Sequence, residues 1–167
     1  MELTNRILVN KGYRERLRVI EEYEADRIFC RHDMEHFLDV ARIAYALDLE
    51  RGYGLSKDLI YAAALLHDIG RAEEYRTGQS HDEAGADIAE VVLVECDATA
   101  EYIRVIKEAI QTHRGQDIGG LFAKDGKGDI LSRLIKEADK LSRPCFSCQA
   151  SPECKWPEEK KNNKLYY

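Results

Sequence analysis

The chain has 167 residues, a formal net charge of −6 at pH 7 and an isoelectric point near 5.4. With 34% charged and 44% hydrophobic residues it has the composition of one folded domain, and its acidic charge argues against binding a nucleic-acid polymer, which needs a basic surface. Charges run through the N-terminal stretch "MELTNRILVNKGYRERLRVI" and no apolar run is long enough to span a bilayer, so we expect a cytoplasmic protein with no membrane partner.

Apolar residues recur at helical spacing along most of the chain, and no stretch shows the strict alternation of a half-buried strand. Six helices are predicted, within residues 3–24 with an interruption near Gly12, over 33–50 and 56–70, from about 82, from about 99 to 113, and over 130–142. Polar, glycine-containing segments at 71–81 and 115–129 are predicted to be loops that border a central cleft. The sequence therefore predicts an all-α helical bundle over residues 1–143, with a cysteine-containing tail, 144–167, packed on the same domain.

The stretch "AAALLHDIGR", residues 62–71, ends an apolar helix in two strong metal ligands, His67 and Asp68. Adjacent helical residues point about 100° apart, so both can reach one ion only where the helix ends, and Gly70 is expected to supply that end. Four further metal-ligating residues lie on or at the edge of other predicted helices: His36, His81, His113 and Asp139. Any one of them alone is explained as a helix cap or a surface residue, but together and in this order they indicate a metal site.

This ordered pattern, H…HD…H…H…D, resembles the HD-domain superfamily of metal-dependent phosphohydrolases over roughly residues 32–143. The motifs that carry the resemblance are "HFLDVARIAYAL", "AALLHDIGR", "SHDEAGADIAEVV", "AIQTHRG" and "IKEADKLSR". The resemblance implies a first metal ion held by His36, His67, Asp68 and Asp139. It also implies membership of the dinuclear subset, in which His81 and His113 bind a second ion and Asp68 bridges the two.

Imidazole and carboxylate ligands favour divalent iron, manganese, zinc, nickel or cobalt over magnesium. The resemblance implies a hydrolase that cleaves a nucleotide or a related phosphate ester or anhydride with a metal-activated hydroxide. Asp68 would orient the nucleophile and Arg71 would hold a phosphate oxygen, although Arg71 is explained equally well as a surface arginine paired with a neighbouring glutamate. Lys140, and His32 if the helix of His36 extends that far, are further candidates for contact with a small phosphorylated substrate.

Two other functions remain open at this stage. The resemblance also covers mixed-valent di-iron oxygenases, whose ligand set is similar and which would consume oxygen without releasing phosphate. A metal-stabilised regulatory module would bind a nucleotide tightly without turnover. Neither the native metal nor homo-oligomerisation is decided by the sequence.

The chain has five cysteines, an odd number that argues against a complete disulfide framework. Cys96 lies on an apolar helix and is predicted to be a small buried hydrophobic residue. Cys145, Cys148 and Cys154, in "CFSCQASPEC", have the spacing of a soft-metal site but are one ligand short of a tetrahedron.

Cys30 is the predicted fourth ligand of that site. It lies six residues before His36, and Cys145 lies six residues after Asp139. If His36 and Asp139 meet on antiparallel helices, both cysteines are displaced in the same direction by about 9 Å. Structural zinc, an iron–sulfur cluster and free cysteines in a loosely ordered tail all remain open.

Overall fold

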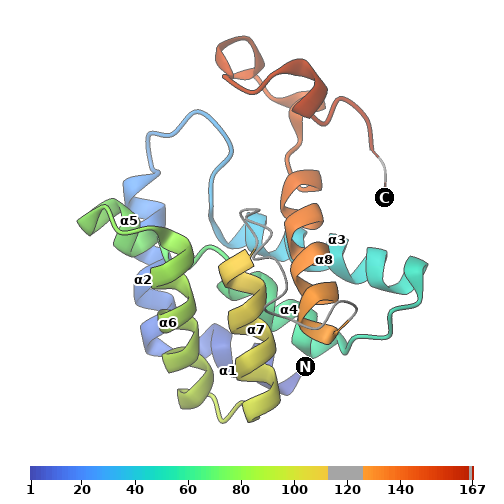
Figure 1. Ribbon diagram of the computed structural model, residues 1–167. Helices are drawn as coiled ribbons and strands as arrows, with labels where there is room; N and C mark the ends of the chain where they lie inside the picture. The colour runs from blue at the N-terminus through green and yellow to red at the C-terminus, as the bar shows by residue number, and fades with distance from the viewer. Residues whose placement is uncertain (113–125, 166) are drawn as a thin grey trace.

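The computed structural model describes residues 1–112, 126–165 and 167, and within these residues every regular element is a helix (Figure 1). The α-helices are α1 Glu2–Val9, α2 Lys11–Tyr23, α3 Met34–Arg51, α4 Lys57–Leu66, α5 Arg71–Thr77, α6 His81–Glu95, α7 Ala100–Thr112 and α8 Lys127–Leu141. Three single 3₁₀ turns follow α8: η1 Cys145–Ser147, η2 Ser151–Glu153 and η3 Glu158–Lys160. The predicted all-α bundle is confirmed.

Eight α-helices are present in the described residues where about six were predicted. The first predicted helix is divided at Asn10, whose extended backbone ends α1 and whose side chain accepts a hydrogen bond from the Tyr13 amide of α2. The predicted loop at 71–81 was wrong, because most of it forms α5. Its residues are good helix formers, Ala72 is buried against the core, and Gly78 ends the helix in a left-handed conformation with φ of 79°.

Helix α4 forms the centre of the bundle. Its sequence is apolar on all sides, and every residue from Leu59 to Leu66 except Tyr61 is buried. Such a helix requires neighbours around it, and α1, α3, α7 and α8 pack against it. None of the described helices combines the length and the apolar character needed to cross a membrane. The central position of α4 places its C-terminal end, which carries His67 and Asp68, inside the protein.

Capping interactions fix where the helices around this centre begin and end. The Asp33 side chain accepts from the His36 amide at 3.0 Å and starts α3, and Gly52, with φ of 65°, ends it. The Ser56 hydroxyl accepts from the Leu59 amide at 3.1 Å and starts α4, as predicted. These caps place His36 in the first turn of α3, which is the turn nearest to the end of α4.

Gly70 allows a close approach between two segments. Helix α4 ends at Leu66, so it is already complete before Gly70, whose φ of −68° lies in the ordinary helical region. A Cβ atom at Gly70 would lie 2.1 Å from the His81 carbonyl oxygen and 2.5 Å from the Gly85 amide nitrogen. The absence of a side chain therefore lets the first turn of α6, with His81, lie directly against the turn that carries Asp68.

The C-terminal segment, residues 144–165, lies beyond the end of α8 (Figure 1). The charged last part of this segment folds back on the rest. The Asn162 side chain donates to the Arg143 carbonyl at 3.0 Å, and the Phe146 amide donates to the Asn162 carbonyl at 3.1 Å. Lys161 donates to the Ser151 carbonyl at 3.2 Å, and its side chain is only 8% exposed. These bonds join the turns of the segment to one another and to the end of α8.

Candidate metal centre

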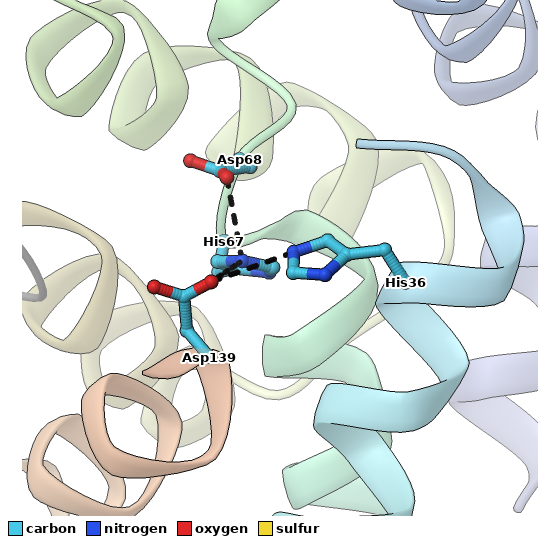
Figure 2. Close-up of side chains that lie close together, drawn as sticks. All are labelled: His36, His67, Asp68 and Asp139. Atoms are coloured by element: carbon cyan, nitrogen blue, oxygen red, sulfur yellow. Dashed lines mark ion pairs between the residues drawn. The ribbon is translucent and has the colours of Figure 1, made fainter. Parts of the chain in front are cut away.

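Four residues from three helix ends meet in the interior of the bundle (Figure 2). His36 comes from the first turn of α3, His67 and Asp68 follow the last residue of α4, and Asp139 comes from the last turn of α8. Each offers one ligand atom, and these atoms all lie within 4.8 Å of one another. Two histidines and two carboxylates are a ligand set suited to divalent transition metals.

The spacing of these atoms fits ligands of one ion better than direct hydrogen bonds. Asp139 Oδ1 lies 3.5 Å from His36 Nε2 and 4.0 Å from His67 Nε2, and His67 Nε2 lies 3.5 Å from Asp68 Oδ2. These distances exceed those of ordinary N–H···O bonds. Two ligands bound at about 2.1 Å to a tetrahedral ion stand about 3.4 Å apart, which is close to the observed spacing.

Hydrogen bonds at Nδ1 turn Nε2 of each histidine toward the centre. His67 Nδ1 lies 2.7 Å from the Ala64 carbonyl oxygen, which can only accept, so Nδ1 carries the proton. The Ser142 hydroxyl donates to the Asp139 carbonyl at 2.7 Å, so it accepts from His36 Nδ1 at 3.3 Å. Partners of this kind fix the tautomer and the ring orientation of metal-binding histidines.

Burial keeps the His36 imidazole neutral. Loss of solvent, followed by the effects of the neighbouring His67 and His32, lowers the pKa of His36 to about 3. The neutral ring is the form that donates a lone pair to a metal ion. His36 is therefore in its metal-binding form at neutral pH.

A second group of polar side chains lies on the other side of Asp68. The Oδ1 atom of Asp68 lies 3.4 Å from His81 Nε2, and Oδ1 of Asp82 lies 2.8 Å from the same nitrogen. His81 is buried, and its Nδ1 lies 2.8 Å from Glu74 Oε2, a carboxylate–histidine pair that directs Nε2 toward Asp68. His113, the other residue expected here, lies outside the described residues.

Arg71 lies against the Asp68 carboxylate. Its Nε atom is 2.9 Å from Asp68 Oδ2, and Nη1 is 3.8 Å from Glu74 Oε2. Burial opposes the charge, but the Asp68 carboxylate outweighs it and raises the pKa of Arg71 above its usual value. The side chain is 15% exposed and lines the cavity described below. Arg71 therefore pairs with a neighbouring glutamate and also faces the site.

His32 also reaches the site, although α3 begins only at Met34 and does not extend to it. His32 Nε2 lies 3.6 Å from Asp68 Oδ2, and Nδ1 lies 2.7 Å from Glu24 Oε1. Burial of Glu24 is outweighed by hydrogen bonds from His32 and Tyr75, which lower the pKa of Glu24 to about 2. The ionised Glu24 thus holds His32 against Asp68.

Lys140 is not brought to the site. It is exposed, and it is not among the residues that line the cavity. The sequence also failed to indicate Glu24, Glu74 and Asp82. Asp82 had a signal, because residues 81–82 repeat the His-Asp dipeptide of residues 67–68.

A cavity of about 520 Å³ opens beside the ligands. It is lined on one side by the side chains His32, His36, Arg71 and Asp139. Other lining residues come from the rest of the α2–α3 connection and from the C-terminal segment, and they include four cysteines: Cys30, Cys145, Cys148 and Cys154. The candidate metal centre and the cysteines therefore share one cavity.

Comparison with known families decides the nature of the bundle. A model of the HD domain family matches residues 33–143, the range that contains all the ligands described above. The chain belongs to the HD-domain family. HD domains bind divalent metal ions, and the histidine–aspartate group could hold one.

Individual relatives agree with this placement of the HD protein. A solved structure of a predicted HD superfamily hydrolase from an uncultured Thermotogales bacterium is 25% identical, with a TM-score of 0.60 over 89% of this chain and 80% of that one. An uncharacterized protein from Clostridium beijerinckii is 40% identical over the full length of both chains. Ribonuclease Y from Enterococcus faecalis is 32% identical over 109 residues, which make up 65% of this chain and 18% of that enzyme. The family is therefore that of HD superfamily hydrolases.

Proposed function

We propose that this HD protein is a phosphohydrolase with two metal ions that acts in the cytoplasm on a small phosphorylated molecule, most simply a nucleotide. The observation that carries the proposal is the position of the Asp68 carboxylate between two ligand groups. One oxygen lies 3.5 Å from His67 Nε2 and the other lies 3.4 Å from His81 Nε2. When bound, two such ions lower the pKa of a coordinated water and neutralise charge on a phosphoryl group.

The charge of the cavity supports an anionic substrate. The whole chain carries a net charge of −6, yet five basic side chains line this cavity: Arg27, Arg71, Arg143, Lys155 and Lys161. Among the described lining residues the only acidic one is the candidate ligand Asp139. A basic cavity on an acidic protein concentrates anions locally and repels them elsewhere.

In this proposal each side chain near the ligands has a separate role. Arg71, planar and permanently charged, contacts a nonbridging phosphate oxygen and at the same time fixes the Asp68 carboxylate. His32, held by Glu24, contacts the substrate from the α2–α3 connection. His81 is directed by Glu74, and Asp82 adds a carboxylate to the second ligand group.

The dimensions of the cavity and one relative support a nucleotide. A volume of about 520 Å³ falls in the range of small-molecule sites, which is roughly 300–1,000 Å³. The similarity to ribonuclease Y supports a substrate containing a nucleotide phosphate, although the matched segment is less than a fifth of that enzyme. We therefore favour a free nucleotide or a short phosphate ester over a polymer.

Metal analysis followed by a phosphate-release screen tests the proposal. Protein purified without chelator is expected to contain two transition-metal ions per chain at this site, and to release phosphate from one class of nucleotide with Mn, Fe, Co or Ni. The Asp68→Asn variant is expected to lose both properties. Phosphate release that survives complete removal of metal would overturn the proposal.

Two other results would favour a different function for this protein. Iron-dependent oxygen consumption without phosphate release would place the chain with the di-iron oxygenases of the superfamily. Tight nucleotide binding without turnover under every metal would indicate a regulatory module. Each result is measured on the same purified protein.

A further inference from the structure

Four cysteines from separate parts of the chain converge on one cavity. Cys30 lies in the α2–α3 connection, Cys145 begins η1, Cys148 follows η1 and Cys154 follows η2, yet all four line the cavity beside the HD ligands. All of them are free thiols in the structure, and all are partly buried. Cys96, the fifth, is 3% exposed and belongs to the apolar core, as predicted. The convergence is thus confined to the cysteines that the sequence singled out.

Two successive turns of the same kind present the C-terminal cysteines. Cys148 follows η1 and Cys154 follows η2, each with an extended backbone (φ −75°, ψ 118° and φ −70°, ψ 125°) and an amide that donates to the residue three positions earlier at 3.3 Å. Residues i and i+3 of a 3₁₀ turn lie above one another, so Cys145 and Cys148 face the same way. Such C-x2-C turns are a common way to present thiolates to a metal.

The C-terminal segment has little apolar core of its own. Of residues 144–165 only Ala150 is buried, while Phe146, Trp156 and Leu165 are 54%, 50% and 62% exposed. A segment of this length cannot be ordered by so little buried apolar surface. Metal–thiolate bonds are the usual substitute for a missing core in small segments.

Basic side chains lie near the cysteines. The Lys161 ammonium interacts with Cys154 and Cys145, and the Arg143 guanidinium interacts with Cys30. Cations at these positions would balance part of the negative charge of thiolate ligands.

The distances between the sulfur atoms bear on whether the cysteines hold one zinc ion or an iron–sulfur cluster. Around one zinc ion with Zn–S bonds of about 2.3 Å, tetrahedral sulfurs stand about 3.8 Å apart. All four cysteines lie in the described residues, and no three of their sulfur atoms lie within 4.8 Å of one another. Among the described residues, only the atoms of the histidine–aspartate group are that close together. An iron–sulfur cluster places several iron and sulfide atoms between its thiolates and so holds them farther apart.

We propose that Cys30, Cys145, Cys148 and Cys154 ligate an iron–sulfur cluster that forms the wall of the cavity opposite the HD ligands. The cluster joins the α2–α3 connection to the C-terminal segment and holds Arg143 and Lys161 at the cavity. In this arrangement residues 144–167 are part of the same domain as the helical bundle. The proposal does not depend on the phosphohydrolase activity, because its ligands are different.

Acid-labile sulfide is the decisive measurement, because the HD ligands bind metal without sulfide. The full chain is purified under anaerobic conditions, and iron, zinc and acid-labile sulfide are measured per chain together with the visible absorption spectrum. We expect a fixed amount of sulfide per chain, and an equal amount of iron in Asp68→Asn, in which the HD ligands no longer hold metal. Cys30→Ser and Cys154→Ser are each expected to lose the sulfide and the visible absorption.

Two controls separate this site from the HD centre and from general misfolding. Cys96→Ser changes a cysteine outside the cavity and is expected to retain the sulfide. Asp68→Asn removes a ligand of the HD centre and is expected to retain the sulfide while losing the HD metal. Helical circular dichroism of every variant verifies that the bundle is folded.

Two results would overturn the proposal. One is stoichiometric zinc without sulfide that is lost in Cys30→Ser, which would show a zinc site on the same residues. The other is a parent protein, purified anaerobically, without sulfide and with metal content unchanged in Cys30→Ser and Cys154→Ser. Loss of hydrolysis in Asp68→Asn would bear on the proposed function alone.

Discussion

The two sides of the cavity are built by different physical means. On one side lie the lining residues His36 and Asp139, which stand with His67 and Asp68 at the ends of packed helices, so the packing of the bundle sets their positions. On the other side, the C-terminal segment buries one residue, and its turns are held by hydrogen bonds and by whatever the cysteines bind. The first side is organised before any ligand arrives, whereas the second depends on its ligand. Substitutions that act on one side alone test this difference.

The largest effect is expected from Asp68→Asn. The amide cannot bridge two ions with two anionic oxygens, so hydrolysis and HD-site metal are both lost. The loss should exceed the roughly 10- to 100-fold that removal of an outer partner causes. Steady-state phosphate release and metal content measure it.

The fold of this variant should be unaffected, because packing and not metal positions these helix ends. Helical circular dichroism and sulfide content are the comparison. A global loss of helix in Asp68→Asn would contradict the view that packing organises this side.

The next largest effect is expected from Gly70→Ala. The added methyl group would lie 2.1 Å from the His81 carbonyl oxygen, so α6 must move away from the turn that carries Asp68. Overpacking of this kind costs about 1–3 kcal/mol in the free energy of unfolding. Denaturant unfolding should show this cost, and metal titration should show weaker binding.

Gly12→Ala is the matched control for this substitution. A Cβ atom at Gly12 would meet the ends of the flexible Arg16 and Asn10 side chains at 3.3 Å. Its effect on stability should be small, and metal binding should be unchanged. Equal effects of the two alanines would show that the close approach at Gly70 is unimportant.

A smaller effect is expected from Glu24→Gln, which removes the charge that holds His32. Activity should fall by about 10-fold, the lower end of the range for outer partners. The lowered pKa of Glu24, about 2 against an ordinary 4.5, means that its contribution to stability is complete above pH 4.5 and is lost as the pH falls toward 2.

The variant should therefore lose part of the pH dependence of stability in that window, which acid unfolding of the metal-free protein measures. Glu22→Gln is the control, because Glu22 is exposed in the last turn of α2, which Glu24 follows, and pairs with Arg18. A similar change in both variants would exclude a special role for Glu24.

The smallest effect on the helical bundle is expected from Cys154→Ser. The chain has one tryptophan, Trp156, which lies 4.9 Å from the Arg143 guanidinium and so reports on the C-terminal segment. Its fluorescence and the rate of proteolysis near Lys155 should change, while the unfolding of the helices stays the same. A large drop in helical stability would show that the two sides are coupled.

The sequence was sufficient for most of the bundle and for the first ligand group. Helical periodicity located the main helices, whose starts at Asp33 and Ser56 coincide with capping side chains, and His67 and Asp68 were recognisable because an apolar helix ends there. Helix α5 was missed, because a helix of 7 residues with one buried side chain has almost no periodic signal. Predicting α5 requires knowing which neighbouring residues bury Ala72.

The partners of the ligands could not be predicted. Glu24 contacts Tyr75 across 51 residues of sequence, and Glu74 contacts His81 from a helix that was expected to be a loop. Lys140 was predicted to face the substrate because it follows Asp139, but neighbouring residues on a helix point about 100° apart. Since Asp139 faces inward on α8, Lys140 faces solvent.

The hydrogen-bond acceptors of His67 and His81 differ in whether a single substitution can remove them. His67 Nδ1 donates to a main-chain carbonyl, that of residue 64, which every amino acid provides. His81 Nδ1 donates to the side chain of Glu74, which a single nucleotide substitution can remove. Drift in sequence therefore leaves the tautomer of His67 unchanged, while that of His81 is open to selection. A substitution of Glu74 would therefore affect the orientation of His81 and leave that of His67 unchanged.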